Sequence, residues 1–174
     1  KESYYNGDIK LVASKNSKII IGSYCAIGNN LKILTLNHDY NYPSVLGKFY
    51  KIYFNHKHPG EINYPPTIER TKGNVYIGND VWIGDDVTIL SGVTIGDGCC
   101  IGTKSVVTKN LPPYSICCGI PCKIIKYRYS SEIINFLLSI KWWLWSDDKI
   151  KKNKKFFFTN LNTIDINQLK KFIS

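Results

Sequence analysis

Apolar positions recur every six residues through the middle of the chain. From residue 77 to residue 112 each block of six opens with Ile or Val, and its fifth position holds Val, Cys, Ser or Leu. The same phase is visible earlier, over residues 21–38. A period of six fits neither a 3.6-residue helix nor the two-residue alternation of one long strand. The pattern therefore predicts short strands joined by tight turns.

The chemistry of each block suits one side of a coil. The aliphatic residue at position one is expected to point inward, and the small residue at position five fills the remaining core. Gly, Asn or Asp near position two supplies the positive φ that a corner demands. Three such sides make one triangular coil, and coils must stack because a single coil cannot bury its own apolar face. We therefore expect a mainly β fold built as a solenoid of parallel strands.

A long segment without this phase interrupts the repeat. It begins after His38, the repeat resumes near Val75, and it carries four prolines and many tyrosines. Loops of this length are usually functional or disordered, and the aromatic residues favour a functional one. We expect one inserted loop over about residues 39–74.

Beyond the repeat the spacing of apolar residues becomes helical. Pro112 and Pro113 end the ladder of strands. Residues 131–138 have apolar positions at helical spacing after a capping serine, Ser146 starts a second helix, and residues 163–172 are a third candidate. The expected division is a β domain over residues 1–129 and a helical extension over residues 130–174.

This extension is expected to cap the solenoid. An uncovered end would leave backbone groups free to pair with another chain, so covering it with helices makes structural sense. The three tryptophans of the extension are expected to pack its helices together: Trp142, Trp143 and Trp145.

Composition and charge place the chain among folded proteins. It has 174 residues, 44% of them apolar and 21% charged, which suits one ordinary domain with an appendage. Much of the net charge of +10 comes from lysines between residues 141 and 171. These lysines form either a solvated helix face or a surface that attracts a phosphorylated cofactor. No nucleic-acid-binding module is recognisable. Neither a membrane-spanning stretch nor a signal peptide is found, so a cytoplasmic protein is expected.

The six cysteines do not predict disulfides or a metal site. They form no CxxC pair, and no histidine stands near them. Reduced thiols used as small apolar residues are the simpler interpretation.

Several motifs together resemble the hexapeptide-repeat acyltransferases. They are Asn37-His38 before a loop with Tyr42-Pro43, the block of residues 81–84 (VWIG), the turn of residues 119–121 (GIP) and the tail of residues 140–145 (IKWWLW). Over residues 15–155 they are similar to the xenobiotic acetyltransferase branch, which includes chloramphenicol and streptogramin acetyltransferases and many polysaccharide O-acetyltransferases. The resemblance implies a left-handed parallel β-helix, acetyl-CoA as co-substrate, no metal, and a homotrimer whose subunits form the active-site groove between them.

Two departures from the family pattern stand out. Cys117 and Cys118 occupy positions where Ala or Gly is usual. The loop over residues 44–71 has no recognisable pattern of an antibiotic-modifying enzyme, and this leaves the acceptor open.

Acetyl transfer to a hydroxyl needs a base, and three histidines are available. Imidazole accepts a proton near neutrality. His38 closes a block where the loop leaves the coil, and the resemblance implies that it is the catalytic base. We expect direct attack of the acceptor oxygen on the thioester, with backbone donors stabilising the oxyanion. His56 and His58, with Asn37 and Tyr42, are candidate acceptor contacts, the alternative being solvated loop residues.

The resemblance also implies a coenzyme A site. Trp82 would border the pantetheine arm, and Lys123 with Lys126 or Arg128 would neutralise the 3′-phosphate. The remaining candidates are Asp85 and Thr103, for backbone contacts, and Thr108 and Lys109, near the adenine. The alternative for each is a packing or solvated surface residue.

The sequence thus favours an acetyl-CoA-dependent O-acetyltransferase acting on a sugar of a surface polysaccharide or its precursor. An antibiotic O-acetyltransferase and a sugar N-acetyltransferase remain alternatives, and a non-catalytic β-solenoid binding protein is a rival from another class. A zinc lyase of the γ carbonic anhydrase type needs three histidine ligands. Two of the three histidines here lie in the inserted loop, which argues against that reaction.

Overall fold

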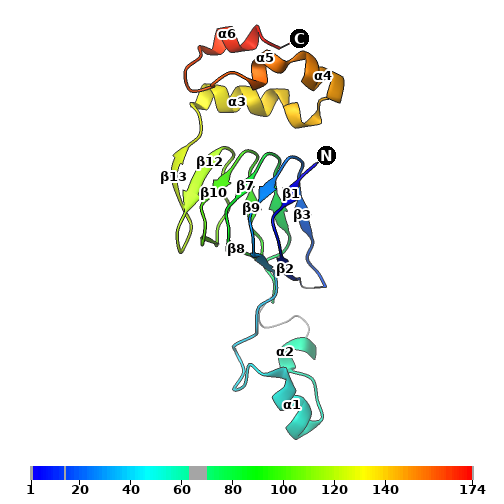
Figure 1. Ribbon diagram of the computed structural model, residues 1–174. Helices are drawn as coiled ribbons and strands as arrows, with labels where there is room; N and C mark the ends of the chain where they lie inside the picture. Colours follow the sequence, from blue (N-terminus) through cyan, green and yellow to red (C-terminus); the bar gives the residue numbers. More distant parts are fainter. Residues whose placement is uncertain (1, 14, 63–69, 174) are drawn as a thin grey trace.

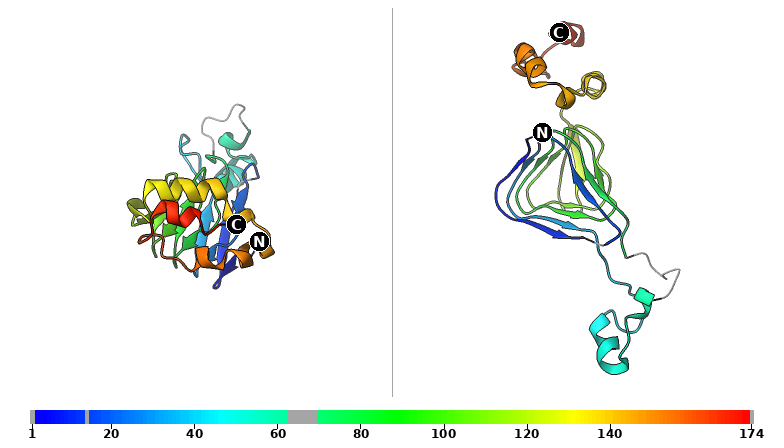
Figure 2. Two further views of the ribbon diagram at one scale, coloured as in Figure 1. Left: turned by 90° about the horizontal axis from the view of Figure 1, so that it is seen from above. Right: turned by 90° about the vertical axis from the view of Figure 1, so that its right-hand side faces the viewer.

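The computed structural model describes residues 2–13, 15–62 and 70–173. Its body consists of three sheets through which the chain winds in turn, and their strands pair in parallel except for β12 and β13 (Figure 1). Successive strands such as β6, β7 and β8 belong to different sheets, and each strand pairs with the equivalent strand of the next coil. The right-hand view of Figure 2 looks along the stack and shows its triangular outline.

The strands are short, as the six-residue repeat predicts. The six-stranded sheet has the order β1 (Tyr4–Tyr5), β4 (Ala26–Ile27), β7 (Trp82–Ile83), β10 (Cys100–Ile101), β12 (Ser115–Cys118) and β13 (Lys123–Tyr127). The four-stranded sheet has the order β11 (Val106–Val107), β8 (Thr88–Leu90), β5 (Leu31–Leu34) and β2 (Ile9–Val12). The three-stranded sheet has the order β3 (Ile19–Ile21), β6 (Val75–Ile77) and β9 (Thr94–Ile95).

The core of the stack confirms the inward positions of the repeat. The aliphatic residues that open the blocks, from Ile77 to Val107, are buried, and so are the fifth-position residues Val81, Val87, Val93 and Cys99. Strand pairing places these residues directly above one another, for example Ile83 beside Ile27 and Ile101. Because each coil buries its side chains against its neighbours, stability is expected to depend on the whole stack.

The corners correct one prediction about glycine. Positive φ occurs at position four of a block, as at Asp80 (φ 55°), Asp86 (φ 58°) and Lys104 (φ 59°), rather than at position two. The position-two glycine is needed because coils approach closely there. A Cβ atom added at Gly84 would lie 2.7 Å from the backbone nitrogen of Thr103.

The inserted segment leaves the corner between the four-stranded and the three-stranded sheet. It contains α1 (Gly47–Phe54) and α2 (Pro59–Ile62), and it projects away from the body (Figures 1 and 2). Residues 63–69, part of the predicted loop, lie outside the described residues. No residue of α1 is buried.

The predicted C-terminal helices are present. They are α3 (Ser131–Ile140), a 3₁₀ turn η1 (Trp142–Leu144), α4 (Asp147–Lys152), α5 (Lys154–Phe157) and α6 (Ile166–Lys170). Ser130 caps α3 by accepting a hydrogen bond from the backbone N–H of Ile133, and Ser146 caps α4 in the same way. Trp143 and Trp145 are buried among these helices, as expected.

These helices do not cover the end of the stack, so the predicted cap was wrong in its position. They lie along the corner between the three-stranded and the six-stranded sheet (Figure 1). Tyr24 at this corner contacts Trp142, with ring centroids 5.2 Å apart, and Tyr114 packs with Ile133 and Leu137. At the end of the stack β13 instead folds back antiparallel on β12. The aromatic side chains of the corner turns supply an apolar strip that the helices bury.

The six cysteines are free thiols, and Cys25, Cys99 and Cys117 are buried. Within the described ranges, no helix combines the length and the apolar character needed to cross a membrane.

Candidate active site

His38 follows β5 at the point where the inserted segment leaves the coil. Its ring Nδ1 lies 3.2 Å from the carbonyl oxygen of Val45. A carbonyl oxygen only accepts hydrogen bonds, so Nδ1 carries the proton and donates. The lone pair of the neutral ring is therefore on Nε2, the atom that a general base uses to accept a proton.

The exposed imidazole borders a small pocket of about 90 Å³. The residues lining this pocket, which we call the His38 pocket, come from both ends of the inserted segment and from α1 and α2: His38, Asp39, Val45, Gly47, His58, Glu61 and Arg70. The predicted base thus lies in a pocket formed by the inserted segment.

A set of hydrogen bonds around Arg70 closes the base of the inserted segment. The backbone N–H of Asn37 donates to the carbonyl of Arg70 over 2.7 Å, and Arg70 Nε donates to the carbonyl of Asn37 over 3.1 Å. Arg70 Nη1 also forms an ion pair of 2.8 Å with Glu61 Oε1. Sequence reasoning missed both Arg70 and Glu61, because no motif marks either residue. Asn37, predicted as an acceptor contact, takes part here through its backbone.

His58 has a structural role within the inserted segment, which differs from the predicted acceptor contact. It is buried, its Nδ1 accepts from the backbone N–H of Gly60 over 3.0 Å, and Nε2 donates to the carbonyl of Ser44 over 3.1 Å. Tyr42 packs edge-on against the ring, with centroids 5.2 Å apart. Because both ring nitrogens have partners, His58 has no free hydrogen-bonding atom for an acceptor.

His56 lies in a second pocket next to the first. It is exposed and lines a pocket of about 500 Å³, which we call the lysine pocket. The remaining lining residues are Gly47, Lys48, Lys51, Asn55, Lys57, His58 and Glu61. The structure thus brings His56 near the predicted base, across the shared wall of the two pockets.

The predicted coenzyme A residues lie on several surfaces of the body. Trp82 points outward from the six-stranded sheet with 49% of its surface exposed, and it is in register with Ala26 and Cys100. Asp85 and Thr103 are exposed at the corner between the six-stranded and the four-stranded sheet, where Asp85 Oδ1 accepts from the backbone N–H of Asn29 over 2.7 Å.

The other cofactor candidates lie further along the stack. Thr108 and Lys109 follow β11, at the same corner as His38 but two coils away. Lys123 and Lys126 are exposed on β13, and among the described residues neither makes an ion pair. Exposed, unpaired ammonium groups of this kind are suited to binding a phosphate.

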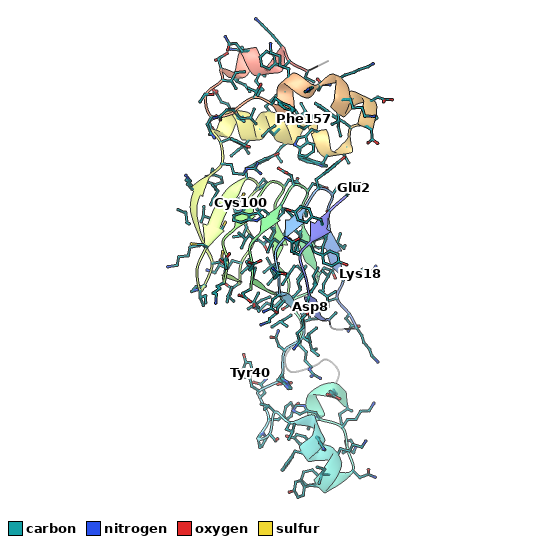
Figure 3. The ribbon with its side chains drawn as sticks, in the orientation of Figure 1. Glu2, Asp8, Lys18, Tyr40, Cys100 and Phe157 are labelled. Carbon is teal, nitrogen blue, oxygen red and sulfur yellow. The ribbon has the colours of Figure 1, made fainter. Side chains whose placement is uncertain are left out.

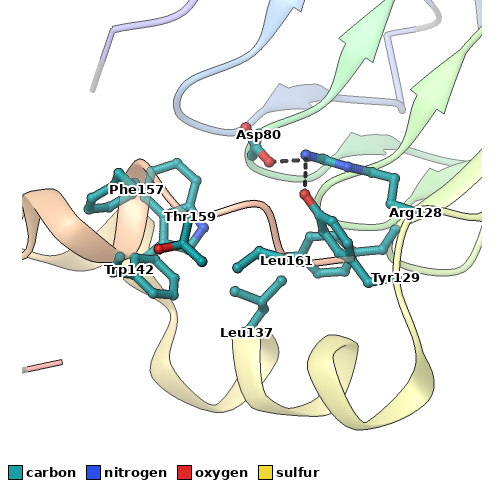
Figure 4. Close-up of a pocket in the computed structure, with 10 residues that line it drawn as sticks. Asp80, Arg128, Tyr129, Leu137, Trp142, Phe157, Thr159 and Leu161 are labelled. Carbon is teal, nitrogen blue, oxygen red and sulfur yellow. Dashed lines mark hydrogen bonds and ion pairs between the residues drawn. The ribbon is translucent and has the colours of Figure 1, made fainter. Parts of the chain in front are cut away.

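Arg128 is engaged inside the molecule and does not join these two lysines. Its Nη1 lies 3.0 Å from Asp80 Oδ2 and 2.9 Å from the carbonyl of Gly98, and its Nη2 donates to the hydroxyl of Tyr129 (Figure 4). Burial raises the pKa of the Asp80 carboxyl above its ordinary value, and Arg128 partly offsets this rise. We therefore leave Arg128 out of the coenzyme A site.

The pocket around Arg128 lies between the C-terminal helices and the corner that joins the three-stranded to the six-stranded sheet. Leu137, Trp142, Phe157 and Leu161 form its apolar wall opposite the ion pair (Figure 4). It contains neither His38 nor an exposed lysine.

Within one chain the predicted base and the predicted cofactor residues stay apart. No cofactor candidate lines the His38 pocket. Figure 3 shows Cys100, the neighbour of Trp82 in register, on the body, whereas Tyr40 lies on the segment that leads away from it. Over residues 2–13, 15–62 and 70–173, no group of three or more His, Cys, Asp or Glu side chains is placed to hold a metal ion.

Comparisons with known proteins agree with the repeat and with the motifs. Residues 74–109 match the family model described as bacterial transferase hexapeptide (six repeats). The chain is 39% identical over 137 residues to a chloramphenicol acetyltransferase of Klebsiella aerogenes, an alignment that covers 77% of this chain and 63% of the relative. It is 43% identical over 138 residues to a probable macrolide acetyltransferase of Lysinibacillus sphaericus, covering 78% and 74%.

A solved structure is similar in fold. A mutant of AntD, an N-acyltransferase from Bacillus cereus in complex with dTDP and Coenzyme A, aligns with a TM-score of 0.52 at 20% identity, covering 80% of this chain and 68% of that one. The alignment to the Klebsiella relative spans less than two thirds of that protein's length. The identity and coverage with the Lysinibacillus relative show the family. The chain belongs to the hexapeptide-repeat acyltransferases, in the xenobiotic acetyltransferase branch with the chloramphenicol and probable macrolide acetyltransferases that it matches.

Proposed function

We propose that this chain is an acetyl-CoA-dependent O-acetyltransferase with His38 as its general base. The observation that carries the proposal is the hydrogen bond from His38 Nδ1 to the carbonyl of Val45, because it leaves Nε2 free to accept a proton beside a pocket. Family membership supports the reaction type.

In the proposed mechanism acetyl-CoA supplies a thioester carbonyl that the acceptor oxygen attacks. His38 Nε2 takes the hydroxyl proton as the new C–O bond forms, which makes the oxygen a competent nucleophile. The Nδ1–Val45 hydrogen bond holds the ring and helps to stabilise the imidazolium. When the C–S bond breaks, the imidazolium returns its proton to the departing sulfur, so the enzyme ends as it began and no acyl-enzyme forms.

We propose further that the body, residues 1–129 with an insertion over about residues 39–74, is a left-handed parallel β-helix, and that residues 130–174 are an extension. The triangular parallel coil and the hexapeptide family support this assignment. The active unit would be a homotrimer in which His38 of one subunit meets the cofactor groove of another. The separation of His38 from Trp82 within one chain supports a shared site.

The coenzyme A groove would use the outward face at Trp82, with Asp85 and Thr103 beside it. Lys123 and Lys126 would hold the 3′-phosphate, and Thr108 and Lys109 would lie near the adenine. Thr108 is half-buried and the others are exposed, which fits such a groove.

The acceptor we favour is a sugar hydroxyl. Tyr40, Tyr53 and Phe54 of the inserted segment are exposed, and aromatic faces stack on the apolar faces of sugar rings. An antibiotic hydroxyl is the second candidate, supported by the names of the related proteins.

The direct test replaces His38 by Ala and measures acetyl-CoA consumption with nucleotide sugars, oligosaccharides, chloramphenicol and streptogramins. A loss of about 10²- to 10⁴-fold in turnover is expected, with an unchanged circular dichroism spectrum because the side chain is exposed. The exposed Lys152→Ala variant in α4 serves as the control and should keep full turnover. A His38→Ala protein with near-normal rate would rule out the base, and an active monomer in light scattering would rule out the shared site.

A further inference from the structure

The lysine pocket adjoins the His38 pocket. The two pockets share the wall residues Gly47, His58 and Glu61. A molecule whose hydroxyl meets His38 therefore extends into the lysine pocket if it is larger than the small space beside the imidazole. The groups that line the second pocket would then contact the rest of such an acceptor.

Among the residues that the structure describes, the charge lining the lysine pocket is positive and is not compensated by an unpaired carboxylate. Lys48, Lys51 and Lys57 line it and are exposed. The acidic side chain in its wall, Glu61, is already paired with Arg70 at 2.8 Å. Among the described residues, none of these three lysines makes an ion pair.

The position of the lysines concentrates this charge on one side of the pocket. Lys48 and Lys51 are three residues apart on α1, so their side chains lie on the same face of the helix. Lys57 follows shortly after α1, whose C-cap Asn55 is in the left-handed conformation, and it lines the same pocket. Ammonium groups on long flexible stems bind carboxylate and phosphate as point charges, without a fixed geometry.

We propose that the acceptor of this enzyme carries an anionic group, a carboxylate or a phosphate, which binds Lys48, Lys51 and Lys57 while its hydroxyl lies at His38. The inference rests on the proposed function and adds the charge class of the acceptor. Acidic sugars and sugar phosphates then bind productively, and neutral acceptors lose the electrostatic contribution. Such an attraction between exposed charges acts over about 10 Å at 0.1 M salt and weakens as salt is added.

The test compares three acceptors that share the methyl β-D-glucopyranoside ring and differ at C6: methyl β-D-glucuronide, methyl β-D-glucoside 6-phosphate and the neutral methyl β-D-glucoside. Acetyl transfer is followed with the wild-type chain and with Lys48→Glu and Lys51→Glu. The matched control is Lys152→Glu, an exposed lysine of α4 on the far side of the body. The wild-type chain is expected to favour at least one anionic acceptor by about tenfold in kcat/KM at low salt. The carboxylate and phosphate arms show which anion the pocket prefers.

Each substitution in the lysine pocket should reduce the ratio of kcat/KM for the anionic acceptors to kcat/KM for the neutral acceptor by about tenfold, mainly by raising KM for the anionic acceptors. In the wild-type chain, 0.5 M NaCl should reduce the same ratio. Lys152→Glu should leave the ratio unchanged. Equal or faster turnover of neutral acceptors, chloramphenicol included, overturns the inference, as does a ratio that Lys51→Glu does not change or a lack of turnover with both anionic acceptors. The proposed function fails separately, if His38→Ala retains full turnover on whichever acceptor the enzyme uses.

Discussion

The guanidinium of Arg70 donates a hydrogen bond of 3.1 Å to the carbonyl oxygen of Asn37, the residue immediately before His38. The same side chain reaches Glu61 in the adjoining α2. Arg70 thereby connects three parts of the inserted segment: the point where it leaves the body, the point where it rejoins the body, and the helix α2. The position of the His38 ring relative to the pocket depends on this junction, so we regard Arg70 as a positioning residue.

Replacement of Arg70 by Gln is expected to lower kcat about tenfold or more and to leave KM for acetyl-CoA within about twofold, since small misplacements of a catalytic group are costly. The pH dependence of kcat/KM should keep its shape, because His38 remains the base. Arg70→Lys should recover part of the loss through the ion pair with Glu61. Steady-state kinetics over a pH series provides the measurement.

The neighbouring variant Lys72→Gln is the control, because its side chain does not line the His38 pocket. If Arg70→Gln raised KM for acetyl-CoA while kcat stayed constant, Arg70 would act on cofactor binding instead.

The ion pair between Arg128 and Asp80 is expected to make stability depend on pH. Burial raises the pKa of Asp80 in the folded state, so the folded protein holds this proton more tightly than the unfolded chain does. The free energy of unfolding that Asp80 contributes is therefore highest below its ordinary pKa of 3.8 and falls as the pH rises through the raised value.

Arg128→Met removes the group that offsets this rise, and it should cost about 2 kcal/mol at pH 7.5 and less at pH 4.5, because a larger share of Asp80 is protonated at the lower pH. Urea unfolding at the two pH values measures this difference. In a double-mutant cycle, Asp80→Asn with Arg128→Met should cost less than the sum of the single changes. Additive costs at both pH values would show that the pair is not coupled.

Two tyrosines that contact Arg128 provide a matched pair of substitutions. The hydroxyl of Tyr114 is buried and has no hydrogen-bond partner among the described residues, whereas the hydroxyl of Tyr129 accepts from Arg128 over 3.0 Å. Tyr114→Phe should leave the free energy of unfolding unchanged or raise it by about 1 kcal/mol, and Tyr129→Phe should lower it by about 1 kcal/mol. The melting temperature should then fall by roughly 2–4 °C in Tyr129→Phe and stay constant or rise in Tyr114→Phe. A loss of stability in Tyr114→Phe would reveal a partner for that hydroxyl, such as an ordered water.

The sequence predicts correctly those features of the fold that depend on residues close together along the chain. The inward positions of the repeat, the short strands and the starts of α3 and α4 follow from local spacing and capping, and the structure confirms them. The positive φ expected at position two of the block lies instead at position four. Gly84 is instead required by the approach of Thr103 from the next coil, a contact between blocks that local spacing does not reveal.

Contacts between distant residues account for the other differences. The helices lie along a corner rather than over the end because Tyr24 and Tyr114, ninety positions apart in the sequence, present their rings to the helices from equivalent turns. The engagement of Arg128 with Asp80 and the two hydrogen bonds of His58 likewise join residues that no motif connects. His38 could be predicted as a candidate base because its position at the exit of the insertion follows from the repeat itself.

The cysteines should differ strongly in their reactivity toward alkylating reagents. Burial raises the pKa of the Cys99 thiol to about 11, so only about one molecule in a thousand holds the reactive thiolate at pH 8. Cys99 is also inaccessible in the core, whereas Cys118 is exposed on β12. Brief treatment of the native protein with iodoacetamide at pH 8, followed by peptide mass spectrometry, should label Cys118 and leave Cys99 unmodified. Labelling in 8 M urea should modify both, and Cys118→Ser should remove the native signal. If Cys99 were labelled in the native state as fast as Cys118, the coils around it would open far more readily than their packing implies.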